Sequence, residues 1–274
     1  PLSPTAPGRS ADDALAAIEG LWRGSDIEPL QSRIVPTSWA ALDAELPGGG
    51  WPCNSLTECL TAQPAILEWR LVGPALAPLA AGGRPIALIG APKIPHVGGL
   101  AHLGLQPRML VHVAASAPAE RLWATEQLVK AGAAAAVLAW LPQARPEQIR
   151  RLQVLAQAHD GPVILFRPIQ AGLQSSAAPL RLEAAPANAW QLRIQIVKRR
   201  GPMHDTPLLL DSIPGGLAQV LTERVRSQPA QVGAVSVATP AVAIPSPQEV
   251  THAPAYAVGG RAAVAGRPRI AAVA

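Results

Sequence analysis

Short apolar runs, spaced through the middle of the chain, constrain its fold more than any other feature of the sequence. Each run has the length and residue types of a buried strand, and helix-length stretches separate the runs. Continuous apolar runs are typical of parallel strands, because helices cover both faces of a parallel sheet. The sequence therefore predicts an α/β fold with a mainly parallel sheet flanked by helices. The predicted strands are residues 55–60, 85–89, 109–113, 135–140 and 163–166.

The stretches between these runs carry helix start and stop signals. Pro118 and Pro146 stand where a first helical turn tolerates proline, which has no N–H to satisfy there. Gly82 and Gly132 stand where a helix commonly ends, because glycine adopts the left-handed backbone of a C-cap. The predicted helices are residues 65–81, 118–131 and 146–159.

Beyond Arg167 the pattern changes to strict alternation. Leu180 and Leu182 alternate with Arg181 and Glu183, and residues 190–196 continue in the same way. A period of two is typical of half-buried antiparallel strands, and residues 207–210 complete a small meander. The sequence therefore predicts a C-terminal antiparallel β extension at the edge of the sheet.

The two ends of the chain differ in composition from its body. Residues 1–20 are polar and proline-rich, and residues 226–274 are rich in Ala, Val and Pro with few charges. Alanine buries little area, and proline interrupts both helix and sheet. We expect a flexible N-terminal segment (1–20), one domain (21–225) and a disordered Pro/Ala-rich tail (226–274).

Composition also bears on location and partners. The start of the chain lacks the pattern of a secretory signal, and no apolar segment has the roughly 20 residues that span a bilayer, so we expect a cytoplasmic protein with no membrane contact. The net charge is +5, and almost all cations are arginines. Arginine suits bidentate contact with phosphate or carboxylate, although a GC-rich coding sequence explains the same bias.

Cysteine and histidine spacings predict no metal centre. Cys53 and Cys59 are the only cysteines, and their spacing fits neither a zinc site nor a redox Cys-x-x-Cys motif. His96, His102 and His112 are spaced so that no two share a helical face. We expect free thiols, no metal and no cofactor.

Five short motifs follow one another along the chain: residues 42–52 (Leu-Asp-Ala-Glu-Leu-Pro-Gly-Gly-Gly-Trp-Pro), 57–58 (Thr-Glu), 137–142 (Val-Leu-Ala-Trp-Leu-Pro), 165–168 (Leu-Phe-Arg-Pro) and 198–201 (Lys-Arg-Arg-Gly). Their order resembles the RecA core and, more closely, the ImuA family of translesion-synthesis proteins, which is related to the division inhibitor SulA. The resemblance implies a RecA-like sheet.

In that setting, the segment after the first strand is where a nucleotide loop is expected. A phosphate-binding loop needs glycines, so that successive N–H groups turn toward the anion, and a lysine for the β and γ phosphates. Residues 59–68 contain neither. The loop is therefore degenerate at Thr61, Gln63, Pro64 and Glu68, and Glu68 places negative charge where a phosphate is expected.

The resemblance implies that two further catalytic positions are also lost. In RecA-like ATPases a general-base Glu follows the second strand and a magnesium-binding Asp closes the Walker B strand. Here the second strand is followed by Ala91, Pro92 and Lys93, and Ala139 stands in the degenerate Walker B strand. We therefore expect no enzyme activity. A relocated nucleotide site rests on Lys93 alone, and a lone lysine in a proline-rich loop is more often simply solvated.

The resemblance implies a function in DNA damage tolerance. An ImuA-like protein is a non-catalytic accessory component of SOS-induced translesion synthesis. It docks an ImuB-like Y-family factor, an error-prone DNA polymerase III alpha-type subunit, RecA, or a combination of these, and it is nucleoid-associated when recruited to damage. Two alternatives remain: a SulA-like inhibitor that binds FtsZ, and a RecA-like DNA-dependent ATPase.

Five residues are candidates for partner or nucleic-acid contact. Lys198, Arg199 and Arg200 end the best antiparallel strand, and Arg193 lies on its polar side. Clustered cations release counterions when they neutralise a nucleic-acid backbone, although a solvated strand end explains the same cluster. Trp51, in a glycine loop at the mouth of the cleft, is a candidate anchor for a partner.

In RecA relatives the loops after the fourth and fifth core strands face single-stranded DNA. Here these are residues 141–145 and 167–179, which contain few cations and no aromatic residue on which bases could stack. We therefore expect weak DNA contact at most.

Overall fold

The structure is a computed structural model that describes residues 33–213, 217–226 and 270–272. The segment predicted as flexible, residues 1–20, lies outside these residues, as does most of the tail predicted for residues 226–274. Within the described ranges, no helix has the length and apolar content needed to cross a bilayer.

The described residues alternate between strands and helices, as the apolar runs predict. The strands are β1 (Ile34–Val35), β2 (Trp51–Pro52), β3 (Leu56–Thr61), β4 (Ile86–Ile89), β5 (Leu110–Val113), β6 (Ala136–Trp140), β7 (Val163–Pro168), β8 (Leu180–Pro186), β9 (Gln191–Lys198), β10 (Leu208–Asp211) and β11 (Ile270–Ala272). The helices are α2 (Ala40–Glu45), α3 (Glu68–Ala81), α4 (Val97–His102), α5 (Pro118–Ala131), α6 (Pro146–Ala156), α7 (Leu217–Val220) and α8 (Glu223–Arg226), with 3₁₀ turns η1 (Pro107–Met109) and η2 (Ile169–Leu173).

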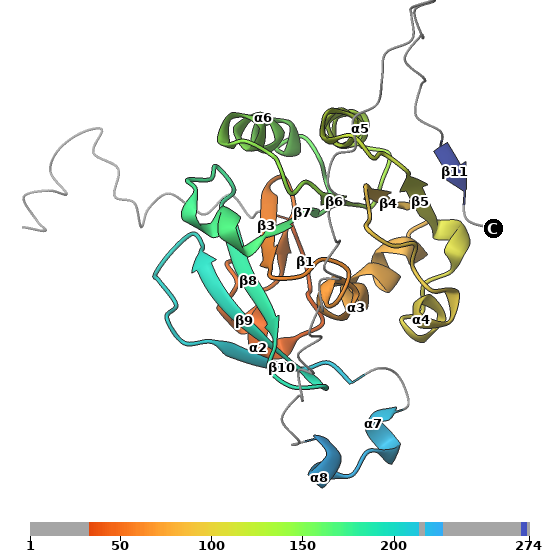
Figure 1. Ribbon diagram of the computed structural model, residues 1–274, viewed down its shortest axis with the longest axis vertical. Helices are drawn as coiled ribbons and strands as arrows, with labels where there is room; N and C mark the ends of the chain where they lie inside the picture. Colours follow the sequence, from red (N-terminus) through yellow and green to blue (C-terminus); the bar gives the residue numbers. More distant parts are fainter. Residues whose placement is uncertain (1–32, 214–216, 227–269, 273–274) are drawn as a thin grey trace, which may run out of the picture.

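One large twisted sheet organises the molecule (Figure 1). Among the described residues it has nine strands in the order β10-β9-β8-β3-β7-β6-β4-β5-β11. The six strands from β8 to β5 in this order are parallel to one another. The predicted fold class is confirmed: α/β, with a mainly parallel sheet flanked by helices and antiparallel strands on its C-terminal side.

The C-terminal extension differs from the prediction in one strand. β9 and β10 are antiparallel to their neighbours, as expected, but β8 runs parallel to β3. Arg181 on β8, predicted on a polar face, is buried opposite Glu58 of β3. The alternating pattern was misread here because an ion pair, described below, buries the charged position.

Two apolar cores lie on the two faces of the sheet. Ile86 and Leu88 of β4 pack toward α2, α3 and α4, whereas Ala87 and Ile89 pack toward α5 and α6. This is the alternation that a strand buried on both faces requires. The helix after β3 and the helix after β4 therefore lie on one face, and the helix after β6 lies on the other.

Helix boundaries agree best where proline and glycine mark them. α5 begins at Pro118 and is capped by Gly132, whose φ of 63° is left-handed. α3 begins at Glu68, three residues later than the prediction of 65–81. The sequence pattern did not predict α4, because this short helix contains two glycines and follows a segment with two prolines.

The predicted disordered tail contains one described strand. β11 (Ile270–Ala272) pairs antiparallel with β5 at the outer edge of the sheet. In Figure 1, β11 lies beside β5, close to the C-terminus.

Candidate functional site

The sheet offers one place where its topology favours a ligand. In an open α/β sheet the ligand crevice lies at the carboxyl ends of strands whose following connections leave toward opposite faces. Here those are the carboxyl ends of β3, β4, β6 and β7. Residues from all four ends line a cavity of about 110 Å³ there, with Thr61, Gly90, Trp140 and Phe166 among them. We refer to this cavity as the switch-point cleft.

The carboxylate of Glu68 occupies the start of α3. The N–H of Ala65 donates to Glu68 Oε1 at 2.7 Å, and the N–H of Leu67 donates to Oε2 at 3.1 Å. Glu68 is 1% exposed, and it is the first residue of the helix, where unpaired N–H groups favour an anion. The chain therefore supplies its own anion to the amides that would otherwise be available to a bound phosphate.

The segment predicted as a degenerate nucleotide loop contains a left-handed residue that is not glycine. Ala65 has a φ of 65°, a left-handed conformation that costs an alanine about 1 kcal/mol. Its N–H is one of the two that Glu68 accepts, so the hydrogen bond holds the residue in this conformation. Thr61 is buried at the end of β3, whereas Gln63 and Pro64 are exposed. Because the hydrogen bond from Ala65 to Glu68 holds Ala65 in a left-handed conformation, α3 begins at Glu68 and not at residue 65 as predicted.

Two aromatic side chains, Trp140 and Phe166, line the cleft and narrow it. The indole N–H of Trp140, at the end of β6, donates to Glu68 Oε1 at 3.1 Å. The ring of Trp140 lies 4.7 Å from that of Phe166 on β7, centroid to centroid. Ala139, in the expected Walker B strand, is fully buried among apolar residues. The remaining volume of about 110 Å³ is well below the roughly 300 Å³ at which small-molecule pockets begin.

The end of β4 adds no ligand group to the cleft. Gly90 has a φ of 61°, and its Cα lies against the side chain of Arg121, so close that an added Cβ would be 2.7 Å from Arg121 Cδ. Lys93, the residue on which a relocated nucleotide site rests, is exposed. Neither observation favours a relocated site.

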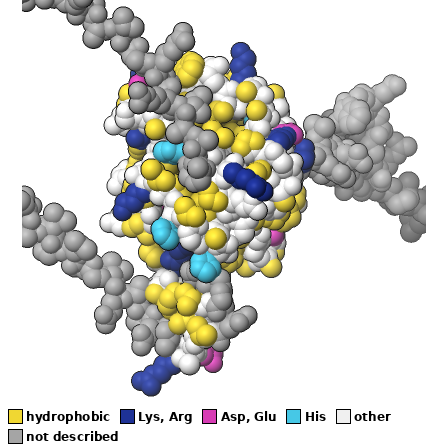
Figure 2. All heavy atoms as spheres, turned by 90° about the vertical axis from the view of Figure 1, so that its right-hand side faces the viewer, with side chains coloured by type: hydrophobic (Ala, Val, Ile, Leu, Met, Phe, Trp, Pro, Cys, Tyr) yellow, Lys and Arg dark blue, Asp and Glu magenta, His cyan; other side chains and the backbone are white. Residues whose placement is uncertain are grey.

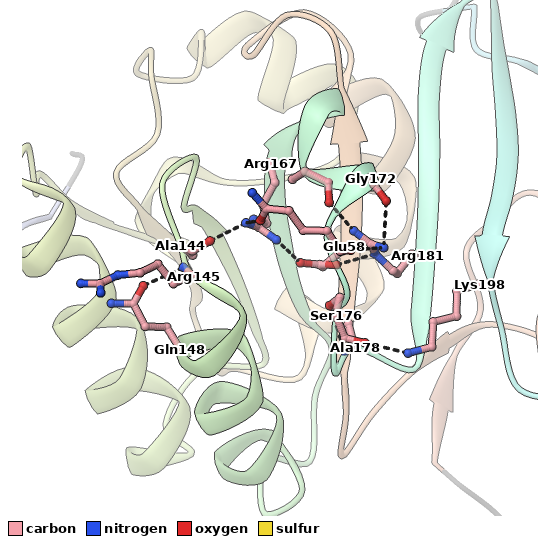
Figure 3. A network of polar contacts seen from close by, with 12 residues as sticks. Glu58, Ala144, Arg145, Gln148, Arg167, Gly172, Ser176, Ala178, Arg181 and Lys198 are labelled. Atoms are coloured by element: carbon pink, nitrogen blue, oxygen red, sulfur yellow. Dashed lines mark hydrogen bonds and ion pairs between the residues drawn. The ribbon is translucent and has the colours of Figure 1, made fainter.

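A buried ion triad lies beside the cleft (Figure 3). Glu58 on β3 is fully buried between β7 and β8, and each of its oxygens accepts from a different arginine. Arg167 Nη1 donates to Oε1 at 2.8 Å, and Arg181 Nε donates to Oε2 at 2.7 Å. The signal that sequence reasoning missed is a glutamate at the centre of an apolar strand, because such a residue needs a charged partner.

The two arginines of the triad also bind the loops above the sheet. Arg167 donates to the carbonyl of Ala144 and, at 3.3 Å, to the side chain of Gln174. Arg181 donates to the carbonyl of Ala171 at 2.8 Å and to that of Gln174 at 3.1 Å. These carbonyls belong to residues 141–145 and 167–179, the two loops for which the resemblance predicted at most weak DNA contact. Both loops are thus fastened to the sheet by arginines whose guanidinium groups point inward.

The basic residues predicted for partner contact do not form one patch. Lys198 Nζ donates to the carbonyl of Ser176 at 2.8 Å, and Arg199 Nη1 donates to the backbone carbonyl of Glu45 and, at 3.0 Å, to its Oε2. Arg200 is exposed beyond the end of β9, and Arg193 is exposed on the same strand, roughly 20 Å away along it. Lys198, Arg193 and Arg200 are exposed, whereas Arg199 is turned inward.

Trp51 does not provide the surface anchor that the sequence suggested. Its side chain is 1% exposed and packs in the core with Leu42 and Leu46. β2 leads through Cys53, which pairs with Pro162, into the amino end of β3. Trp51 therefore lies at the amino end of the sheet, away from the cleft. The neighbouring glycines predicted an exposed loop, but β2 pairs with β1 and the side chain of Trp51 is buried.

Both cysteines are free and buried. Burial, followed by the carboxylates of Glu68 and Glu58, raises the pKa of the Cys59 thiol. Burial also raises the pKa of Cys53 to about 11. Both thiols are therefore neutral and unreactive near neutral pH. Among the described residues, no group of three or more His, Cys, Asp or Glu side chains could hold a metal ion.

The fold and site together define an open α/β domain in which Trp140 and Phe166 line a small switch-point cleft and Glu68 is held by hydrogen bonds beside it. No model of a known protein family matches the chain, and no curated protein matches it.

Proposed function

We propose that this chain is a non-catalytic docking protein with a RecA-like core, and that it serves SOS-induced translesion DNA synthesis as an ImuA-like component. The observation that carries the non-catalytic part is the position of Glu68. Its carboxylate accepts the N–H groups of Ala65 and Leu67 and the indole N–H of Trp140, so three donors at the helix start are already used.

The composition of the cleft supports the same proposal. Beside Glu68, whose carboxylate is already held by three N–H groups, no acidic residue is among the described residues that line the cleft, so no free carboxylate is present to hold the magnesium ion that accompanies a nucleoside triphosphate. Entry of a triphosphate would require displacing Glu68 and moving Trp140. Association with partners would then follow concentration and partner state, without a hydrolysis cycle.

The identity of the partners rests on the resemblance of the motifs. The proposed partners are an ImuB-like Y-family factor, an error-prone polymerase III alpha-type subunit and RecA. The protein would work in the cytoplasm and join the nucleoid at sites of damage.

The nucleotide part is tested by titration with a fluorescent ATP analogue and magnesium. We expect no saturable binding up to about 1 mM, where the free energy of binding would be only about −4 kcal/mol. A magnesium-dependent dissociation constant well below that concentration would overturn the proposal and favour the ATPase alternative.

The partner part is tested by co-purification from damaged cells. Recovery of the polymerase factors supports the proposal, and recovery of FtsZ instead favours the SulA-like alternative. Arg193→Glu, Lys198→Glu and Arg200→Glu alter exposed cations and should weaken binding to an acidic partner or to DNA. Arg199→Glu is the matched contrast, because it breaks an internal contact to Glu45 and should lower stability instead.

A further inference from the structure

The outer edge of β5 pairs with a segment from the far end of the chain. β5 is the outermost parallel strand, and β11 covers its open side (Figure 1). The pairing is antiparallel, with Ile270 opposite Val113, Ala271 opposite His112 and Ala272 opposite Val111. Residues 227–269 separate β11 from α8 along the chain.

The backbone shows which residue of β5 receives a strand. The carbonyl of Val113 accepts the N–H of Gly90 at 3.1 Å, so Val113 directs its polar groups toward β4. Successive residues of a strand direct these groups to opposite sides, so the N–H and C=O of His112 point outward. Because Ala271 is opposite His112, these two residues form the pair that exchanges both hydrogen bonds.

An uncovered sheet edge readily accepts another strand. Its unpaired N–H and C=O groups are a template for an extended peptide, and many peptide-recognition sites work by adding a strand in this way. The surrounding surface also suits such contact, because Figure 2 shows hydrophobic side chains across this side of the molecule with few acidic ones among them. Ile94, Val97 and Trp123, on and next to α4 and on α5, are more than half exposed.

We propose that the outer edge of β5 is an acceptor site for an extended antiparallel peptide, and that the chain's own segment Ile270–Ala272 is its resident occupant. The pairing is intramolecular, so a free peptide competes against an effective concentration of roughly millimolar order. The C-terminal segment thus closes the edge to other strands. This inference concerns strand pairing and does not depend on the function proposed above.

Two proline substitutions in the full-length chain distinguish loss of the β5–β11 pairing from a general effect of proline on the fold. Ala271→Pro removes the N–H that faces His112 and should release β11. Ala272→Pro is the matched control, since the N–H of Ala272 points away from β5 and an edge strand tolerates proline there. The readout is site-resolved amide hydrogen exchange at His112. The amide of Val113, which faces β4, reports on the integrity of the fold.

We expect the His112 amide to exchange roughly tenfold faster or more in Ala271→Pro than in the wild type or in Ala272→Pro, while Val113 stays protected in all three. A synthetic peptide of residues 267–274 should restore protection to Ala271→Pro at roughly millimolar concentration. The same peptide with proline at position 271 should not.

Three results would overturn the proposal. Equal exchange of His112 in the wild type and in Ala271→Pro would show that the segment does not cover the edge. Failure of the wild-type peptide to restore protection would show that the edge is not an acceptor site. Protection in the wild type that rises with protein concentration would show that a second copy supplies the strand, which rules out the resident segment.

Discussion

Ion pairs between arginine and a carboxylate stabilise two regions of the parallel sheet, but one set is buried and the other is partly exposed to solvent. Toward the carboxyl end, Glu58 at the centre of β3 joins Arg167 near the end of β7 and Arg181 of β8, and none of the three side chains is more than 6% exposed. At the amino end, Asp160 joins Arg84 through two hydrogen bonds of 2.7 Å, but these side chains are 43% and 39% exposed. Water screens the second pair and not the first.

This difference shows where the charged groups with the largest desolvation cost lie. Buried charges are expensive to desolvate, and they persist only when every charge is paired. Here they lie at the end of the sheet where α/β proteins bind ligands, and their hydrogen bonds are directed to the protein's own loops. The carboxyl end is therefore fastened at β3, β7 and β8, whereas a cavity of about 480 Å³ remains open beside it between the starts of α5 and α6.

The largest effect is expected for Glu58→Gln. The substitution keeps the size of the side chain but leaves two buried guanidinium groups without a negative partner. Removing one member of a buried ion pair costs about 3–5 kcal/mol, a large part of the stability of a domain. The measurement is urea unfolding followed by tryptophan fluorescence, with the free energy of unfolding compared with that of the wild type.

Glu126→Gln is the matched control for this prediction. Glu126 on α5 accepts two bonds from Arg151 on α6; its own side chain is 16% exposed, but the arginine side chain is 58% exposed, so water screens the charge of the pair. An exposed pair contributes about 0–1 kcal/mol. If Glu58→Gln cost no more than Glu126→Gln, the contrast between buried and screened pairs would be wrong.

A smaller effect is expected for Glu68→Gln. The amide NH₂ of glutamine would face one of the N–H groups that the carboxylate now accepts, and a buried unsatisfied donor costs about 1–3 kcal/mol. Unfolding measured as above should show this loss. Hydrogen exchange at Ala65 and Leu67 should also quicken.

Glu120→Gln supplies the comparison for that substitution. Glu120 accepts the N–H of Ala117 at the start of α5, at 3.3 Å and in an exposed setting. We expect a cost of about 0.5 kcal/mol there. Equal losses for the two glutamates would mean that Glu68 acts as an ordinary helix cap, and the proposed absence of nucleotide binding would lose its main support.

Much of the fold was predictable because many helices and strands are determined by residues close together in the sequence. Apolar runs gave the five strands from β3 to β7, and the prolines and glycines at α5 gave its bounds. The alternating leucines and isoleucines of β9 gave an antiparallel strand for the same reason.

The sequence reasoning failed where a distant partner determines the environment. Arg181 looked exposed until Glu58, from a strand far away in sequence, was placed beside it. Trp51 looked exposed until pairing of β1 with β2 buried it. For the site, the sequence pointed to Glu68, and the structure shows its carboxylate hydrogen-bonded at the start of α3. It did not reveal that Trp140 would reach that acid, because this contact depends on the order of strands in the sheet.

The smallest effect is expected at the amino end, for Asp160→Asn. The side-chain hydrogen bond with Arg84 lowers the pKa of Asp160 from 3.8 to about 2. A carboxyl whose pKa is lower in the folded protein adds stability above its ordinary pKa and loses that contribution as the pH falls through the folded value. The wild type should therefore exceed Asp160→Asn by at most about 1 kcal/mol at pH 6, because the pair is screened, and the difference should shrink as the pH falls below about 4 and vanish only below about pH 2. Urea unfolding of both proteins across this range measures the difference. A gap at pH 2 that is undiminished from its value at pH 6, or one as large as that of Glu58→Gln at pH 6, would contradict the assignment of the amino end as the weakly held side of the sheet.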